Sequence, residues 1–186
     1  MKIIIMRHGR PDISQDEVVS GADFGTWIEA YNSVELDLKV PPPDELFSTV
    51  KNSKATICSA LIRSVDSAKI LEIHNYQSDD YFNEAELPYF DVFHLKFRAK
   101  VWLIFFRILW LLGFSGKVES FSSMKLRAET CSDKLNQLAI EHGTVLFVGH
   151  GILNRTISKN LIKSGWYESV KSKKDYWSFS VYEYKD

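Results

Sequence analysis

The sequence predicts an α/β fold, a three-layer sandwich in which helices cover both faces of a mostly parallel central sheet. Three continuous apolar runs have the length of buried parallel strands: residues 2–6, 55–59 and 144–149. Apolar residues at helical spacing lie between or after these runs, over residues 64–73, 120–142 and 151–164. Strands that alternate with helices in this way form a sheet that is covered on both sides.

The ends of the elements carry their own signals. Gly143 ends the long helix of residues 120–142, and Gly165 ends the helix that starts directly after His150. The last strand, residues 178–184, alternates imperfectly between apolar and polar side chains. That pattern predicts an edge strand or a strand with one exposed face.

With 186 residues the chain is long enough for one hydrophobic core, so we expect a single domain over residues 1–186. Two segments, at about residues 20–46 and 88–120, resemble insertions between the core elements. The first ends in three prolines, Pro41 to Pro43, which cannot be helical. We expect that segment to form the rim of a pocket.

Composition excludes several classes of protein. The net charge of −1 argues against a protein that binds nucleic acid through its phosphates. Two cysteines, Cys58 and Cys131, are too few for a disulfide framework or a cysteine-based metal site and suit a reducing compartment. The amino terminus has no signal-peptide pattern, so a cytoplasmic protein is expected. The histidines lack the paired spacing of a zinc site, and we expect neither a metal nor a cofactor.

Three predicted strands end close to a guanidinium or imidazole group. The first is followed by Arg7-His8-Gly9, the second by Arg63 within Ser59-Ala60-Leu61-Ile62-Arg63-Ser64, and the third by His150-Gly151. Ligands of parallel sheets bind at the carboxyl ends of the strands. A neutral imidazole can attack phosphorus, and arginines can hold phosphate oxygens, so this pattern points to phosphoryl chemistry.

These three segments, in this order, resemble the histidine phosphatase superfamily, whose fold is phosphoglycerate mutase-like. The resemblance implies that His8 is the nucleophile and that Arg7, Arg63 and His150 bind the phosphoryl group, with Gly151 next to His150. It also implies a carboxylic acid after the third strand, which protonates the leaving oxygen and then activates water. Glu84 is the first choice for this acid, and Glu86 is the alternative.

Two further positions follow from the same resemblance. Ser14 stands where many members of the family have a small hydrogen-bonding residue that reaches the phosphate. Arg10-Pro11 replaces a more usual Glu or Gln followed by Thr, so Arg10 is expected to contribute to substrate selectivity without taking part in the chemistry.

The resemblance implies a metal-independent phosphatase that hydrolyses phosphomonoesters, or a phosphorylated protein side chain, through a phosphohistidine at His8. One alternative is a phosphoglycerate mutase, although this chain is short for that activity. Another is a weakly active module that docks a phosphorylated partner or a membrane. The residues of the predicted phosphate pocket are all present, which argues against a purely non-catalytic role.

An apolar segment at residues 101–114 has three interpretations: a core helix, a lid over the active site, or a patch that contacts a membrane or another subunit. It is too short to span a bilayer, which takes about 20 residues. A core or lid helix is favoured over a homodimer contact, and a peripheral membrane contact is favoured least.

Overall fold

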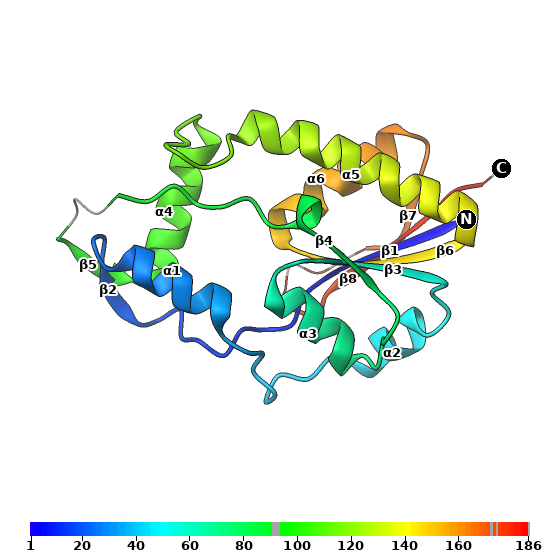
Figure 1. Cartoon of the computed structure of the whole chain (residues 1–186), viewed down its shortest axis with the longest axis horizontal. Coiled ribbons are helices and arrows are strands. Elements are labelled where there is room, and N and C mark those ends of the chain that lie inside the picture. The colour runs from blue at the N-terminus through cyan, green and yellow to red at the C-terminus, as the bar shows by residue number, and fades with distance from the viewer. Residues whose placement is uncertain (91–93, 172, 174, 186) are drawn as a thin grey trace.

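The computed structural model describes residues 1–90, 94–171, 173 and 175–185. Its centre is a six-stranded sheet with the spatial order β4-β3-β6-β1-β8-β7 (Figure 1). The strands of this sheet are β1 (Lys2–Arg7), β3 (Ala55–Ser59), β4 (Gln77–Asp79), β6 (Thr144–Gly149), β7 (Tyr167–Val170) and β8 (Phe179–Glu183). The first four are parallel to one another, whereas β8 is antiparallel to β1 and to β7. The prediction of a mostly parallel sheet is confirmed.

Helices cover both faces of this sheet, as predicted. They are α2 (Asp44–Val50), α3 (Ile62–Ile70), α5 (Phe121–His142) and α6 (Gly151–Lys163). Because successive strand residues point to opposite faces, Ile3 and Ile5 pack against α5 and α6, while Ile4 and Met6 pack against α2 and α3. The sandwich therefore has two separate hydrophobic cores, one on each side of the sheet.

The predicted helix ends are confirmed. Ser120 caps α5, because its hydroxyl accepts a hydrogen bond from the Ser123 amide at 3.1 Å. Gly143 follows the last turn of α5 with φ of 80°, and Gly165 follows α6 with φ of 94°. Both values lie in the region that glycine adopts without steric cost.

The last strand differs from its prediction. β8 lies between β1 and β7 and is neither an edge strand nor half exposed, since Ser180, Val181 and Tyr182 are all buried. The hydroxyls of Ser180 and Tyr182 donate to the carboxylate of Glu168 in β7, at 2.8 and 2.9 Å. This neighbouring strand supplies the polar partners, so a polar residue in β8 does not mark an exposed face.

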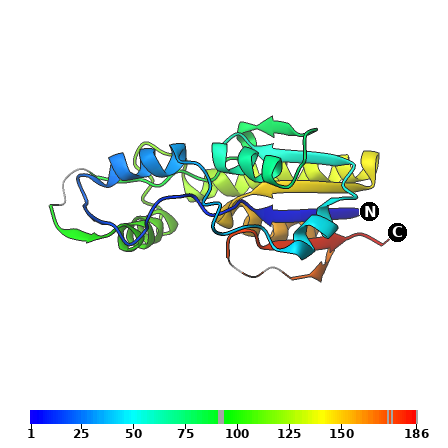
Figure 2. The same ribbon diagram turned by 90° about the horizontal axis from the view of Figure 1, so that it is seen from below.

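The two predicted insertions meet in a smaller part of the molecule. It contains β2 (Val18–Ser20), α1 (Phe24–Ser33), β5 (Lys96–Arg98) and α4 (Ala99–Leu111), and β2 pairs with β5. Phe24 and Trp27 of α1 pack against Trp102 and Phe106 of α4 in a third hydrophobic cluster. Figure 2 shows this part beyond the carboxyl end of β1. Arg7 and His8 of the predicted site lie at that end of the strand. Among the described residues, no helix is long and apolar enough to cross a membrane.

Candidate active site

Strand order brings the three predicted motifs to one edge of the sheet. β6 lies between β3 and β1, and Arg7 at the end of β1 is in register with Gly149 at the end of β6. The amide of His8 donates to the Gly149 carbonyl at 3.0 Å, which holds the two loops together directly after the strands. The ring centroids of His8 and His150 are consequently 4.9 Å apart.

The His8 ring is oriented and protonated as a nucleophile requires. Its Nδ1 lies 2.7 Å from the Gly9 carbonyl oxygen, which can only accept, so Nδ1 carries the proton and Nε2 keeps its lone pair. The ring is buried. Burial, followed by the charges of Arg63 and Arg7, holds the pKa of His8 well below its usual range. At neutral pH the imidazole is therefore uncharged, with Nε2 available for attack.

Gly9 is required by a close approach. A β-carbon at this position would lie 2.3 Å from Cζ2 of Trp177, a distance that no larger residue tolerates without a shift. The Gly9 amide also donates to the hydroxyl of Ser67 in α3 at 2.8 Å. These two contacts fix the loop that presents His8.

His150 is held from both sides. Its Nε2 lies 2.6 Å from the Ser59 hydroxyl, and its amide donates to the side chain of Asn154 at 2.9 Å. Asn154 in turn donates to the Met6 carbonyl at 2.9 Å, which joins α6 to β1. Burial and the neighbouring His8 keep the pKa of His150 well below its usual range. The buried Nδ1 has no described hydrogen-bond partner.

The two arginines lie against aromatic rings. The Arg7 guanidinium is 4.2 Å from the ring centre of Tyr176, and that of Arg63 is 5.1 Å from the ring of Tyr31. Arg63 also donates to the side chain of Asn32 at 2.9 Å and is buried. Burial lowers the pKa of Arg63, while burial and the adjacent Tyr176 raise the pKa of Tyr31. The site thus holds two guanidinium groups, each beside the ring of a tyrosine.

Of the two candidate acids, Glu84 reaches the site. Its carboxylate accepts the amide protons of Ile152 at 2.9 Å and Leu153 at 3.1 Å, in the first turn of α6. A carboxylate is favoured at this position because the amino end of a helix carries partial positive charge. Gly151 lies beside both Glu84 and Arg7, since a β-carbon at this position would be 4.0 Å from Glu84 Oε2 and 3.9 Å from Arg7 Cζ. Glu86 is exposed, and no described hydrogen bond or ion pair involves it.

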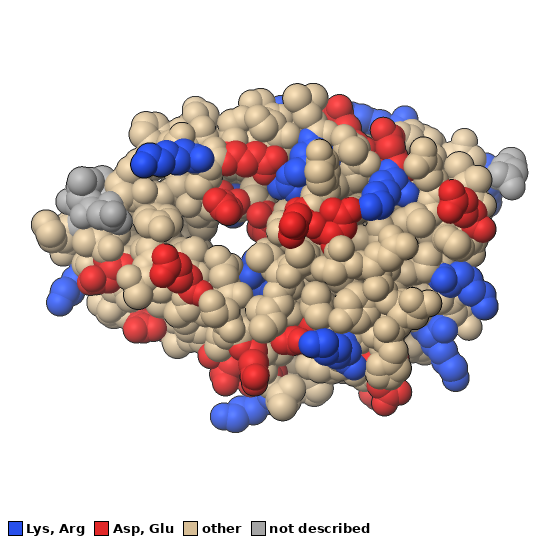
Figure 3. Space-filling model, viewed as in Figure 1, with Lys and Arg blue, Asp and Glu red and all other residues tan. Residues whose placement is uncertain are grey.

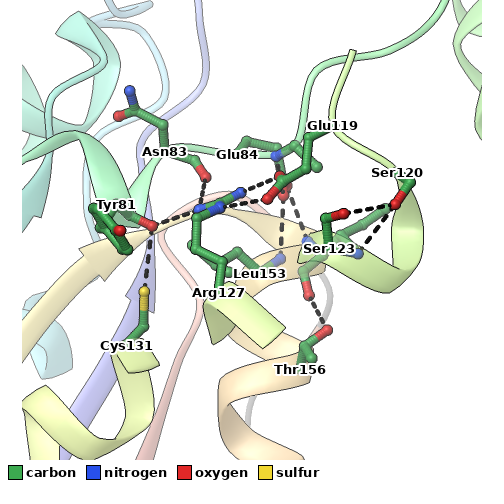
Figure 4. A network of polar contacts seen from close by, with 12 residues as sticks. Tyr81, Asn83, Glu84, Glu119, Ser120, Ser123, Arg127, Cys131, Leu153 and Thr156 are labelled. Carbon is green, nitrogen blue, oxygen red and sulfur yellow. Dashed lines mark hydrogen bonds and ion pairs between the residues drawn. The ribbon is translucent and has the colours of Figure 1, made fainter. Parts of the chain in front are cut away.

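The loop that carries Glu84 is held by Arg127 of α5 (Figure 4). This guanidinium donates to the carbonyls of Tyr81 and Asn83, and it forms two hydrogen bonds to the Glu119 carboxylate, at 2.8 and 2.7 Å. Tyr81 belongs to the short 3-10 helix η1 (Asp80–Phe82), and Asn83 and Glu84 follow it directly. Arg127 therefore positions Glu84 without touching its side chain.

The structure does not bring Ser14 or Arg10 to this cluster. Ser14 is exposed, and its hydroxyl accepts from the Asp16 amide at 3.2 Å. Arg10 is exposed and lies 3.8 Å from the Asp37 carboxylate. The residue after Ser14 reaches the site instead, since Gln15 donates to the Tyr176 hydroxyl at 3.0 Å.

Sequence reasoning missed several residues of the pocket wall, which are Tyr31, Asn32, Ser59, Ser67, Asn154 and Tyr176. Ser59 begins the motif around Arg63 and Ser67 lies three residues after its end, so the motif itself was a signal for them. Tyr31 lies in the segment of residues 20–46, which the sequence predicts to form the rim of a pocket. Nothing in the sequence near Tyr176 distinguishes it from an exposed loop tyrosine.

An opening separates the smaller part from the sheet on the face drawn in Figure 3, and both carboxylates and cations lie at its rim. Within the part of the chain that the structure describes, no group of three His, Cys, Asp or Glu side chains could hold a metal ion. The groups that converge are two imidazoles, two guanidiniums and one carboxylate. This set can bind a phosphoryl group, attack it and exchange a proton with it.

Searches by sequence find neither a matching family model nor a matching curated protein. Solved structures do match. The mycobacterial glucosyl-3-phosphoglycerate phosphatase, solved with VO3, has a TM-score of 0.56 and 18% identity over 87% of this chain and 82% of its own. The α-ribazole phosphatase of Shigella flexneri has a TM-score of 0.55 and 13% identity over 97% of this chain and 89% of its own.

A third match is YhfR of Bacillus stearothermophilus, with a TM-score of 0.58 and 18% identity over 87% of this chain and 80% of its own. These three alignments span 87% or more of this chain at identities of 18% or less. The chain shares the fold of these proteins, which is the phosphoglycerate mutase-like fold expected from the sequence.

Proposed function

We propose that this protein is a phosphatase that hydrolyses small phosphomonoesters through a phosphohistidine at His8. The observation that carries the proposal is the hydrogen bond from His8 Nδ1 to the Gly9 carbonyl, which leaves the Nε2 lone pair free beside Arg7 and Arg63. The fold is shared with proteins whose names describe phosphatases of α-ribazole phosphate and glucosyl-3-phosphoglycerate.

In the first step, Nε2 of His8 attacks phosphorus and the bond to the leaving oxygen breaks. Glu84, in its protonated form, gives its proton to that oxygen, and the product alcohol departs. Arg7, Arg63 and His150 face the charge that spreads over the phosphoryl oxygens during transfer. The phosphoryl group is then bound covalently to His8.

In the second step, water attacks the same phosphorus. The Glu84 carboxylate takes a proton from that water, the phosphorus–nitrogen bond breaks, and its electron pair returns to Nε2. Inorganic phosphate leaves, and both residues recover their starting protonation. The chemistry uses no group beyond these side chains and water.

We further propose that this activity belongs to a single domain, residues 1–186, in a reducing compartment such as the cytoplasm. The buried thiols of Cys58 and Cys131 are both free, and burial raises the pKa of each to about 12. They are consequently poor nucleophiles at neutral pH.

Tyr31 and Tyr176 flank the arginines closely, which favours a small organic phosphate over a phosphorylated protein segment.

The test is hydrolysis of para-nitrophenyl phosphate, with a metal chelator present, by the wild type and by His8→Ala. We expect a loss of at least about a thousandfold in kcat, or roughly 4 kcal/mol of barrier. His142→Ala is the matched control, because His142 is an exposed histidine at the end of α5. Turnover that survives His8→Ala would refute the proposal.

A second measurement separates hydrolysis from phosphoryl transfer between substrates. Incubation with a radioactively labelled phosphomonoester should give a short-lived label on the protein that depends on His8, with rapid release of inorganic phosphate. A stable label that returns to a second alcohol, with little phosphate released, would favour a mutase instead.

A further inference from the structure

The outer face of α4 is apolar without interruption. All the exposed residues of this helix are hydrophobic, namely Val101, Ile104, Phe105, Ile108 and Leu111. The helix buries Trp102, Phe106 and Trp110 on its inner side. The expectation of a core helix is therefore correct for the inner face only.

Neighbouring residues extend this surface. Leu95 and Phe97 precede the helix, Leu112 and Phe114 follow it, and all four are exposed. We call these nine exposed residues, the five of α4 and the four beside it, the α4 face. Exposed apolar surfaces of this extent in soluble proteins mark interaction sites. In Figure 2, α4 lies at the edge of the smaller part opposite to α1, away from the sheet.

The charged residues of the segment that carries the α4 face have one sign. Residues 94–117 contain five cations, Lys96, Arg98, Lys100, Arg107 and Lys117, and no Asp or Glu. Arg107 is turned inward, where it donates to the Ala85 carbonyl at 3.2 Å. Arg98 and Lys100 share the single carboxylate of Asp16, at 3.5 and 2.6 Å. Among the described residues, Lys96 and Lys117 form no ion pair.

We propose that the α4 face docks on the surface of an anionic lipid bilayer. Helices that lie in the plane of a membrane combine an apolar face of Leu, Ile and Phe with flanking lysines and arginines, which is the combination found here. A helix of 13 residues is about 20 Å long and lies on a bilayer rather than across it.

Charge also argues against a second copy of this chain as the occupant. A two-fold contact through the α4 face would bring the same basic rim of both copies together. An anionic headgroup layer instead attracts each unpaired lysine, by about 1 kcal/mol per charge, or a fivefold gain in affinity.

The test is co-sedimentation of the full chain with extruded vesicles of two compositions. One contains equal parts of phosphatidylglycerol and phosphatidylcholine, and the other contains phosphatidylcholine alone. The protein should sediment with the anionic vesicles, and this binding should weaken as salt is added. Equal binding to both compositions, or binding to neither, would overturn the proposal. This measurement uses the wild type and needs no turnover, so it is independent of the proposed phosphatase activity.

Variants locate the contact. Ile104→Glu combined with Ile108→Glu should reduce vesicle binding at least tenfold, because each change places a charge where an apolar side chain would enter the bilayer. Leu126→Glu is the matched control, since Leu126 lies on α5 and is 66% exposed, against 61% for Ile104. A similar loss in the control would overturn the assignment of the binding surface.

The lysines are tested separately. Lys96→Gln and Lys117→Gln should each cost about fivefold in affinity for anionic vesicles. Light scattering of the wild type measures its oligomeric state and so tests whether a second copy of the chain covers the α4 face. A dimer that Ile104→Glu and Ile108→Glu convert to a monomer would assign the α4 face to a second copy and refute the membrane proposal.

Discussion

Replacement of Glu84 by glutamine tests the proposed acid more sharply than any other change. The Glu84 carboxylate accepts two amide protons, from Ile152 and Leu153. A glutamine side chain has one carbonyl oxygen, so it can accept from only one of these amides if its NH2 group faces the other. The unsatisfied amide costs about 1–3 kcal/mol of stability. For a chain of this size, that lowers the melting temperature by about 2–12 °C.

The effect on catalysis should be larger and should depend on the leaving group. Loss of a general acid or base costs about a hundredfold to ten-thousandfold in rate. An alkyl phosphate such as glycerol 2-phosphate has a strongly basic leaving oxygen and needs the proton, whereas nitrophenolate leaves without it. In Glu84→Gln, the first step should therefore be nearly normal with para-nitrophenyl phosphate and strongly slowed with glycerol 2-phosphate.

The assay is rapid mixing of each variant with para-nitrophenyl phosphate, followed by steady-state turnover of both substrates. Glu84→Gln should give a burst of nitrophenol and then slow turnover, because water attack on the phosphohistidine has lost its base. Glu86→Gln is the matched control, expected to change stability by no more than about 0.5 kcal/mol because Glu86 is exposed. If Glu86→Gln lost the activity and Glu84→Gln kept it, the assignment drawn from the helix contact would be wrong.

Three further predictions follow from the same site. Gly9→Ala should destabilise the protein by about 1–3 kcal/mol in chemical denaturation, because the new methyl group overlaps the Trp177 ring; an unchanged midpoint would contradict this. NMR titration should place the midpoint of His8 below 6.5, and stability should fall as pH drops below 6.5, because the unfolded chain binds a proton that folded His8 does not. A midpoint at or above 6.5 would show that burial and the arginines do not control this ring. Arg127→Ala should lower kcat by up to about a hundredfold with less change in KM, since it displaces the Glu84 loop; an unchanged kcat in a variant that folds as the wild type does would contradict this.

The sequence by itself determined the three innermost parallel strands of the central sheet and the residues that meet at their carboxyl ends. Short apolar runs identify β1, β3 and β6, and the residues after them are local to each run. Since parallel strands align their carboxyl ends, His8, Arg63 and His150 converge whatever the loops do. For this reason the three motifs could be assigned to one site, although the first and the last are more than 140 residues apart.

The exposed side of α4 was outside the reach of sequence reasoning. The segment is apolar on nearly all sides, so its periodicity does not distinguish the buried face from the exposed one. Only the packing of Trp102 and Phe106 against Phe24 decides which side faces the protein. The basic residues around the segment were visible in the sequence, but their position beside an exposed apolar face was not.

The aromatic residues around the arginines and the position of Glu84 depended on the tertiary structure alone. Glu84 and Glu86 are two residues apart in an irregular loop, and only Glu84 accepts the amides at the start of α6, almost 70 residues later, among the described hydrogen bonds. Tyr31 and Tyr176 reach the arginines from opposite ends of the chain, through side-chain packing that leaves no periodic trace in the sequence. Local patterns determine which elements form, whereas contacts between distant loops are set only when those elements pack.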